Sequence, residues 1–450
     1  MSILSNITKS FKDDTAIFLI KIFTFLLLLS LFFPIRHVFL TNEAYLTGQY
    51  SDFTSFSLYL SDILIFTTWF LVLMSRGRAF YHVVKSLKWL ILVLFLCFIV
   101  HFGLNTRLNA YFFLKWLELI VAYGTLVVII KEFGLKMGLL KSFAWLVSLQ
   151  ALIALIQFWS QSPLGLFKVG ESHISPAILG VAKIVSGGTT YIRAYGTFPH
   201  PNPLSACLVA GIFIILYLLV TSTTLKWKIT YSVLLLLNIL GLTVTFSRGA
   251  FLALGVGLII FFGWLMVSKR LSTNYLALST VLLSIVISFF LFKPFLLTRA
   301  TFSDQSTIER KFYNATGIKM AEKNPFFGLG AGESVLHMEQ YSGQTLFPWN
   351  KQPPHNYFII SSAELGIPAA LILLWIFLKH LWLLIRKLKS NSDPYLLTLT
   401  SIFICFLLLM LFDHYFYTIE QTKLLLFFTL AMIAVEIKNP HPPAGGRGLV

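Results

Sequence analysis

Long, uninterrupted apolar segments dominate the pattern of hydrophobic and polar positions along this chain. Segments such as 90–100 and 251–267 show no alternation of apolar and polar residues, which favours membrane helices over the strands of a membrane barrel. At about twenty apolar residues per crossing, we expect about twelve transmembrane helices. Their expected starts lie near positions 17, 55, 88, 111, 140, 203, 229, 249, 275, 357, 394 and 421. The pattern predicts an all-α integral membrane protein in which residues 1–450 form a single polytopic domain.

The composition agrees with this prediction, since 57% of the residues are hydrophobic, 44 are Phe and only 12% are charged. A soluble domain could not bury so much apolar surface. The first apolar segment, residues 16–33, is interrupted only by Lys21 and lacks a small-residue cleavage site, so we expect a retained helix and not a removed signal peptide. Cys97, Cys207 and Cys405 fall within apolar segments and are expected to be core residues.

The formal charge of +17 is distributed unevenly along the chain. When the chain is threaded alternately through the membrane, one face collects most of the lysines and arginines. The short connections on the other face hold only Arg36, Arg107, Arg248 and Lys423. Because basic residues are enriched on the cytoplasmic side, this asymmetry predicts that both termini are cytoplasmic. The charge thus indicates topology and contact with anionic membrane lipids, and we expect no nucleic-acid partner.

The same threading sends two long connections to the outer face. Residues 160–202 form the first, and residues 293–355 form the second, larger one, which lies between the ninth and tenth spans and is expected to contain short helices. The last residues, 439–450, are expected to form a disordered cytoplasmic tail. The residues with candidate chemistry lie on or beside the two outer connections.

The first outer connection brings Arg193, His200 and Asn202 to the start of the sixth span. Arg193 and His200 lie on the side where the positive-inside rule supplies no reason for a cation. Arg248 has a similar setting, because in TVTFSRGAFLAL two spans meet with almost no loop. It is either a snorkelling anchor or an anion ligand, since a guanidinium matches phosphate oxygens with two parallel donors.

Ser306 and Glu309 have the spacing of a capping box, which predicts a helix over residues 307–323 on the membrane plane. Arg310 would lie in its first turn, where free N–H groups favour anions, so a cation there is unfavourable unless an anion binds. The sequence NPFFGLGAGES that follows is a glycine-rich turn without the Lys-Ser/Thr ending of a nucleotide-binding loop. As a phosphate signal it is weak.

His355 and Asn356 follow two prolines, at the mouth of a long apolar helix that is expected to begin near Tyr357. Either residue could cap this helix, or His355 could act as a base at the membrane surface. Lys115 and Glu118, near the outer end of the fourth span, are expected to pair with each other. Ionisable groups at that depth are also candidates for function.

Four segments in this order resemble the bacterial O-antigen ligase and O-antigen polymerase family: YGTFPHPNPLSA, TFSRGAFLAL, an arginine-led helix ending in NPFFGLGAG, and PPHNYFIISSAELG. The resemblance covers about residues 190–370 in motif and the whole chain in topology. Its most specific part is a pattern of His, a small polar residue, nine intervening positions, Gly, two further positions, and Gly, Thr or Tyr. His355, Asn356 and Gly366 match this pattern, whereas Ala369 departs from it at the last position.

The resemblance implies a GT-C-like glycosyltransferase of the bacterial cytoplasmic (inner) membrane with an outward-facing active site. It would transfer or polymerise glycan from an undecaprenyl-pyrophosphate donor onto an acceptor hydroxyl of a glycan, lipid or protein, as in lipopolysaccharide biosynthesis, without metal or cofactor. The family's arginines and loop histidine correspond to Arg193, Arg248, Arg310 and His355.

We accordingly expect His355, Arg310 and Arg248 to be catalytic. The arginines would neutralise charge on the departing pyrophosphate, and His355 would accept or orient the proton of the acceptor hydroxyl. The expected substrate-binding residues are Arg193, His200, Asn202, Asn356 and Lys115.

Two other classes of protein fit parts of the pattern. About twelve spans with both ends inside is also typical of transporters and flippases for polysaccharide or lipid-linked oligosaccharide, although no internal repeat relates the two halves here. A peptidoglycan-type polymerase shares the lipid-linked donor, with Asp304 or Glu333 as its candidate acidic residue. Ligase, polymerase and protein O-glycosyltransferase use the same kind of donor, so the sequence leaves the acceptor open.

Overall fold

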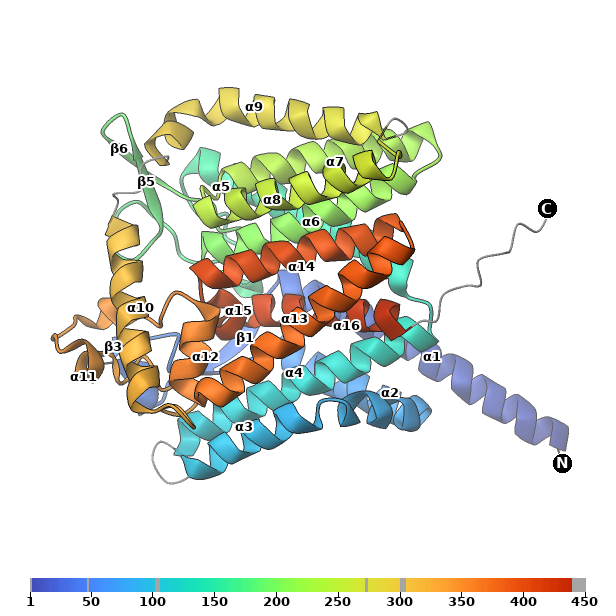
Figure 1. The fold of residues 1–450 in the computed structure, drawn as a ribbon, viewed down its shortest axis with the longest axis horizontal. Helices are drawn as coiled ribbons and strands as arrows, with labels where there is room; N and C mark the ends of the chain where they lie inside the picture. Colours follow the sequence, from blue (N-terminus) through green and yellow to red (C-terminus); the bar gives the residue numbers. More distant parts are fainter. Residues whose placement is uncertain (1, 47, 102–105, 272–273, 300–304, 439–450) are drawn as a thin grey trace.

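A computed structural model describes residues 2–46, 48–101, 106–271, 274–299 and 305–438 (Figure 1). The predicted tail at 439–450 and Asp304 lie outside these described residues. The α-helices are α1 (Ser2–Phe32), α2 (Leu60–Lys85), α3 (Lys88–Val100), α4 (Thr106–Glu132), α5 (Lys136–Ser160), α6 (Pro201–Thr221), α7 (Leu225–Thr243), α8 (Arg248–Val267), α9 (Tyr275–Arg299), α10 (Gln305–Lys323), α11 (Met338–Ser342), α12 (Tyr357–Leu365), α13 (Ile367–Ser390), α14 (Pro394–Phe412), α15 (Tyr415–Thr418) and α16 (Glu420–Lys438).

The expected all-α fold also contains short antiparallel strand pairs. The strands are β1 (Arg36–Phe39), β2 (Tyr45–Leu46), β3 (Gln49–Tyr50), β4 (Phe56–Tyr59), β5 (Lys183–Ser186) and β6 (Thr189–Ile192), paired as β1 with β4, β2 with β3, and β5 with β6. The turn from β5 to β6 consists of Gly187 and Gly188, which both have positive φ angles. Glycine adopts this conformation without strain, and a two-residue turn of this kind matches the twist of a hairpin.

Ten helices of the described residues are long and apolar enough to cross a membrane, fewer than the predicted twelve. They are α1 (over Asp14–Phe32), α2, α4, α5, α6, α7, α8, α9, α13 and α14. Of the other two predicted spans, α3 has only 13 residues. The last, α16, has 19 residues but includes Glu420, Lys423 and Glu436. The predicted count of twelve is therefore not confirmed, because the prediction considered apolar segments without helix length or internal charge.

The long helix expected from Tyr357 is broken in the structure. It ends at Leu365, and α13 begins at Ile367 after Gly366, whose φ is +86°. A Cβ on Gly366 would collide with the backbone of Phe326, so the glycine also permits the second outer connection to cross closely at this point. Near the predicted start of that connection, α9 is kinked: Phe292 has non-helical backbone angles and Pro294 follows, after which helical structure resumes and continues to Arg299.

The core of the bundle is α6, which is almost entirely buried and packs against α5, α7, α8 and α14. Helices in a membrane pack closely where small residues meet. A Cβ on Gly241 of α7 would lie 2.6 Å from Cβ of Ala151 on α5, which shows how closely these helices approach.

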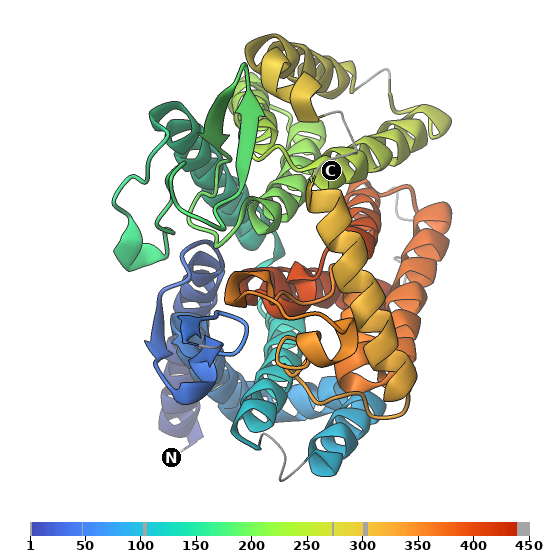
Figure 2. The ribbon, with the colours of Figure 1, turned by 90° about the vertical axis from the view of Figure 1, so that its left-hand side faces the viewer.

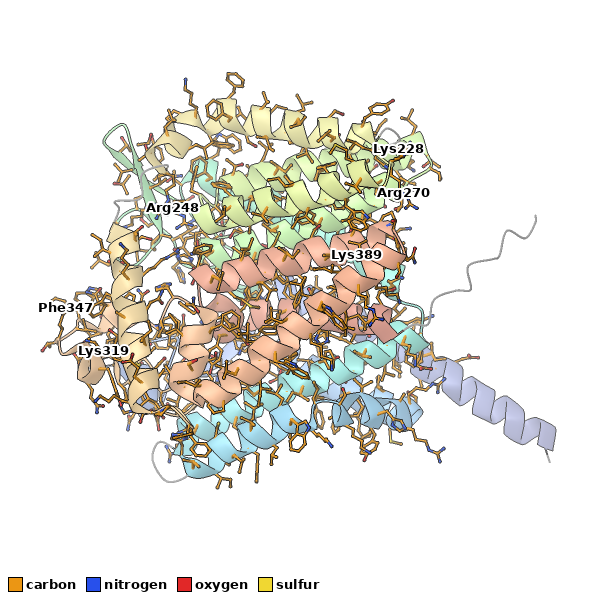
Figure 3. All side chains as sticks on the ribbon, in the orientation of Figure 1. Lys228, Arg248, Arg270, Lys319, Phe347 and Lys389 are labelled. Carbon is orange, nitrogen blue, oxygen red and sulfur yellow. The ribbon has the colours of Figure 1, made fainter. Side chains whose placement is uncertain are left out.

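The long helices run side by side, and the two ends of the bundle carry different elements (Figures 1 and 2). Figure 2 looks onto one end and shows α10 lying across it. Arg248 lies near this end, whereas Lys228, Arg270 and Lys389 lie at the opposite end (Figure 3). The cations that the threading assigned to different sides of the membrane are thus physically separated, while the identity of the cytoplasmic side remains a prediction.

Cysteine labelling tests this sidedness. Thr189→Cys and Gln344→Cys, at exposed positions of the two outer connections, are expected to react with a membrane-impermeant maleimide applied to spheroplasts, whereas Ser390→Cys should react only after permeabilisation. The native cysteines are buried, which keeps background labelling low. Gly170 is unsuitable, because its Cβ would lie 2.5 Å from Pro34. Labelling of Ser390→Cys in intact spheroplasts would reverse the predicted orientation.

Candidate active site

The centre of the candidate site is the carboxylate of Asp413, between α14 and α15. Its Oδ1 lies 3.3 Å from Nδ1 of His355 and accepts the backbone N–H of His414 at 2.9 Å. Its Oδ2 accepts from Nδ2 of Asn202 at 2.7 Å and from Nη2 of Arg310 at 3.4 Å. Four separate parts of the chain therefore meet at one buried carboxylate.

This arrangement keeps Asp413 ionised. Burial by itself favours the neutral acid, but the hydrogen bond from His355 and the positive charge of Arg310 outweigh it and hold the pKa of Asp413 well below its usual value. The neighbouring His414 behaves differently, because burial and the proximity of His355 lower its pKa to about 3. At neutral pH, the site therefore contains a carboxylate beside an uncharged imidazole of His414.

The two residues of the His-Asn pair have different roles in the structure. Asn356 caps α12, since its Oδ1 accepts the backbone N–H groups of Phe358 and Ile359, and its Nδ2 donates to the carbonyl of Leu411. His355 does not cap the helix. It contacts Asp413, and its ring lies 4.8 Å from the ring of His414. The capping interpretation is thus correct for Asn356 and wrong for His355.

The first outer connection reaches the same centre. Arg193 is buried and donates through Nε to the carbonyl of Thr245 and through Nη2 to Oδ1 of Asn202, at 2.6 and 2.8 Å. Asn202 thereby links Arg193 to Asp413. His200 caps α6 through Nδ1, which accepts the backbone N–H of Asn202. Burial and then the charge of Arg193 lower the pKa of His200 to about 3, so it is neutral at physiological pH.

A pocket beside Asp413 concentrates positive charge, with an empty volume of about 340 Å³. Its lining residues are Arg193, Asn202, Ser247, Arg248, Gly249, Arg299, Arg310, Leu409, Phe412, Asp413 and Tyr415. Four arginines and one aspartate give a formal charge of +3, and the pocket also contacts two apolar side chains at the end of α14. Burial and the neighbouring Arg299 lower the pKa of Arg193 to about 9, which leaves it charged at neutral pH. This pocket is suited to an anion attached to an apolar chain.

Arg310 lies in this pocket for a different reason from the one predicted. Helix α10 begins at Gln305, so Ser306 is already inside the helix and Arg310 lies in its second turn. The argument from the first turn of the helix was therefore wrong. What brings Arg310 to the pocket is the placement of α10 across the end of the bundle, which also sets the ring of Tyr313 at 5.6 Å from His355.

The glycine-rich turn of the second outer connection binds a carboxylate of the protein itself. The backbone N–H groups of Gly332 and Ser334 donate to Glu364 of α12, at 2.8 and 3.3 Å, and the Ser334 hydroxyl donates to it at 2.6 Å. The turn thus fastens the connection to α12 and uses these donors internally, which agrees with its weak resemblance to a phosphate-binding loop.

Lys115 does not lie in the arginine pocket. The predicted pair with Glu118 is confirmed at 3.1 Å, but Lys115 also contacts Asp62 at 2.5 Å and approaches Glu420, at 4.0 Å. The sequence also failed to indicate Asp413 and Arg299. A histidine-flanked aspartate between the last two apolar segments was the available signal for Asp413, while Arg299 was hidden in a connection rich in other polar residues.

Two clusters in the described residues have metal-ligand geometry. One is His355, Asp413 and His414, and the other is Asp62, Glu118 and Glu420. In each cluster a basic side chain of the protein already contacts a carboxylate, as Arg310 does Asp413 and as Lys115 does Asp62. These side chains supply the positive charge that a metal would bring, so both donor sets are weak candidates for metal binding.

The buried His414 predicts a sensitivity of stability to acid. Its pKa of about 3 in the folded protein lies below the value of about 6.5 expected in the unfolded chain, so unfolding takes up a proton as the pH falls below 6.5. When the pH falls from 6.5 to 5, the free energy of unfolding of the parent protein should decrease by up to about 2 kcal/mol more than that of His414→Phe. Thermal melting in detergent at pH 6.5 and pH 5 measures this difference. His37→Phe, at an exposed strand position, is the control. Equal losses in the parent and His414→Phe would contradict it.

Comparison with known proteins gives one family match for part of this chain. Residues 233–374 match a family model described as O-antigen ligase, and no curated protein matches the chain. The matched segment contains four of the site residues: Arg248, Arg299, Arg310 and His355. Asp413 and Arg193 lie outside it. Taken with the ten apolar helices, the match indicates a multi-pass bacterial membrane protein of glycosyltransferase type. It supports the assignment of this chain to the O-antigen ligase/polymerase family.

Proposed function

We propose that this protein transfers glycan from an undecaprenyl-pyrophosphate-linked donor to an acceptor hydroxyl at the outer face of the bacterial cytoplasmic membrane. The observation that carries the proposal is the pocket lined by four arginines and by Asp413, whose carboxylate contacts His355. The family match supports the reaction class. The product is cell-surface polysaccharide, formed either by ligation or by polymerisation.

The donor end of the reaction is assigned to the arginine pocket. A pyrophosphate esterified at both ends carries two negative charges, and the formal charge of the pocket is +3. Leu409 and Phe412 on the wall of the pocket offer an apolar surface for the first isoprene units of the carrier. Charges held in a partly buried pocket act more strongly than in water, so the arginines stabilise the leaving pyrophosphate as its charge grows.

The acceptor end is assigned to His355. Its contact with Asp413 favours the tautomer with the proton on Nδ1, which leaves Nε2 free to accept a proton. The acceptor oxygen bonds to the anomeric carbon of the donor sugar while the bond from that carbon to the pyrophosphate oxygen breaks. The hydroxyl proton passes to Nε2 of His355, and the electron pair leaves with undecaprenyl pyrophosphate. This step requires no metal or cofactor.

Asp413 couples the two ends. One oxygen contacts His355 and the other contacts Arg310, so the orientation of the base and the position of an arginine depend on the same group. Through Asn202, the carboxylate also positions Arg193. We assign Asp413 as a positioning residue, since it acts through these side chains.

The transporter alternative predicts a different outcome from a variant of His355. In a deletion strain of the source bacterium, the parent gene should restore surface glycan, whereas His355→Asn should restore roughly a hundredth or less, because removing a general base typically costs a hundred- to ten-thousand-fold in rate. Gel analysis of surface glycan and of lipid-linked intermediates measures this.

The same strain also identifies the acceptor reaction. Loss of chain length in the deletion indicates a polymerase, and accumulation of lipid-linked polymer with a bare acceptor indicates a ligase. Asn356 caps α12 with its own side chain, so His355→Asn should be inserted and folded normally. Near-normal surface glycan from a well-expressed His355→Asn protein would disprove the catalytic assignment.

The arginine pocket makes a second prediction. Arg248→Lys and Arg310→Lys keep the charge but lose the planar pair of donors, so each should weaken binding of undecaprenyl pyrophosphate and reduce transfer by about tenfold or more. Arg107→Lys is the matched control, because the Arg107 side chain is 82% exposed and lies outside the pocket. Unchanged transfer in both pocket variants would leave these arginines as membrane anchors only.

A further inference from the structure

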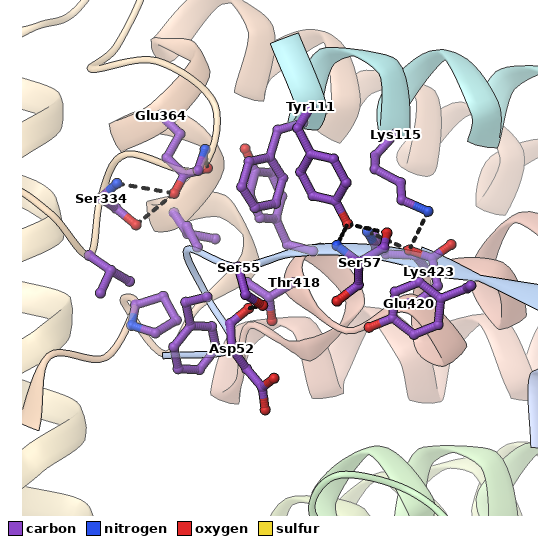
Figure 4. Close-up of a pocket in the computed structure, with 18 residues that line it drawn as sticks. Asp52, Ser55, Ser57, Tyr111, Lys115, Ser334, Glu364, Thr418, Glu420 and Lys423 are labelled. Carbon is purple, nitrogen blue, oxygen red and sulfur yellow. Dashed lines mark hydrogen bonds and ion pairs between the residues drawn. The ribbon is translucent and has the colours of Figure 1, made fainter. Parts of the chain in front are cut away.

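A second cavity, whose lining residues all differ from those of the arginine pocket, has an empty volume of about 580 Å³ (Figure 4). Strand β4, the start of α4, the glycine-rich turn and the start of α16 contribute to its wall. Aromatic side chains form much of this wall: Phe53, Tyr59, Tyr111, Phe112 and Tyr417. Rings combined with a few polar groups are typical of sites for small organic molecules.

The charges of this cavity differ from those of the arginine pocket. Three carboxylates, Asp52, Glu364 and Glu420, and two lysines, Lys115 and Lys423, give a formal charge of −1. Both lysines are already paired, Lys115 with Asp62 at 2.5 Å and Lys423 with Glu420 at 2.9 Å. A phosphate therefore finds no available cation here. The cavity favours an uncharged ligand with many hydroxyl groups.

Among the buried polar atoms of the wall that lack hydrogen-bond partners within the described residues are one oxygen of Glu420 and the hydroxyl of Ser57. Glu420 is 4% exposed, and its Oε1 has no donor, while its Oε2 contacts Lys423. Ser57 is 5% exposed, and its hydroxyl is likewise without a partner. Leaving such groups unsatisfied destabilises a fold, and a carboxylate oxygen needs a donor. A ligand hydroxyl donating to Glu420 and exchanging a hydrogen bond with Ser57 would satisfy both.

The wall of the cavity includes a residue close to His355 in sequence and residues that contact His414. Pro353, two residues before His355, lines it, and so does Thr418, whose hydroxyl lies 2.7 Å from Nδ1 of His414. The ring of Phe53 meets His414 edge to face at 5.7 Å. Asp413 lines the arginine pocket, whereas His414, whose ring lies 4.8 Å from that of His355, contacts two residues of the aromatic cavity wall.

We propose that this second cavity binds the saccharide that carries the attacking hydroxyl, with Glu420 and Ser57 as its binding residues. The inference rests on the proposed function, because it assigns the acceptor of that reaction to a site. It identifies the acceptor as a neutral sugar held in the cavity, next to His355. Donor and acceptor then bind in separate pockets, so the acceptor saccharide does not contact the arginines.

The test measures sugar binding and donor binding separately on the full-length protein in detergent. The sugar probe is the saccharide mixture released by mild acid from the envelope of the source bacterium, and the donor probe is undecaprenyl pyrophosphate. Ser57→Leu fills the cavity and should weaken saccharide binding at least about tenfold, and Glu420→Gln, which loses a charged acceptor, by roughly fivefold. Neither should change binding of undecaprenyl pyrophosphate.

Ser186→Leu supplies the control. It makes the same substitution in strand β5, which pairs with β6 and does not line the cavity. A melting curve verifies folding, and if Ser57→Leu does not fold, Glu420→Gln decides. Unchanged saccharide binding in the folded variants, or no saccharide binding by the parent, overturns the inference. Failure of the parent to bind undecaprenyl pyrophosphate would instead count against the proposed function.

Discussion

A buried carboxylate is stable only when the hydration it has lost is replaced, and Asp413 obtains this replacement from four parts of the chain at once. Asn202, Arg310, His355 and the backbone of His414 each direct a polar group toward it. An ion placed in such surroundings without partners would be strongly destabilising. The loop before α6, the crossing helix α10 and the turn before α12 are therefore held together by a shared electrostatic requirement as much as by apolar packing.

The same carboxylate also explains how several arginines and a neutral imidazole can lie close together in one site. In the proposed reaction, the arginines bind an anion, and the imidazole of His355 must remain available as a base. A carboxylate that contacts both reduces the repulsion among the guanidinium groups and orients the ring. The aromatic cavity beyond His414 has little net charge, so a hydroxyl-bearing ligand there does not compete for the arginines.

Much of the fold could be predicted because membrane helices are specified locally. The apolar segments and the separation of cations between the two ends follow from residues close together in sequence. Errors arose where the outcome depends on distant contacts. The break at Gly366 reflects the approach of the Phe326 backbone, which lies 40 residues away in sequence.

The residues of the candidate site likewise fall into those that the sequence could indicate and those that it could not. Arg193, Arg248 and Arg310 could be recognised individually, because a cation on the outer side lacks a topological explanation. Asp413 could not, since its importance comes from partners as far away in sequence as Asn202, 211 residues distant. The choice between His355 and Asn356 as the cap also required coordinates, because both residue types can accept a hydrogen bond at a helix start. The arginine placements and the catalytic roles remain our proposals.

The network around Asp413 crosses the limits of the segment that matches the family. Arg310 and His355 lie inside residues 233–374, whereas Asn202 and Asp413 lie outside. A chimera that replaced only this segment would separate Arg310 and His355 from Asp413, the carboxylate that both contact here. Because Asn202, Arg310 and His355 all contact Asp413, we expect a substitution at one of these four positions to change which residues are tolerated at the other three.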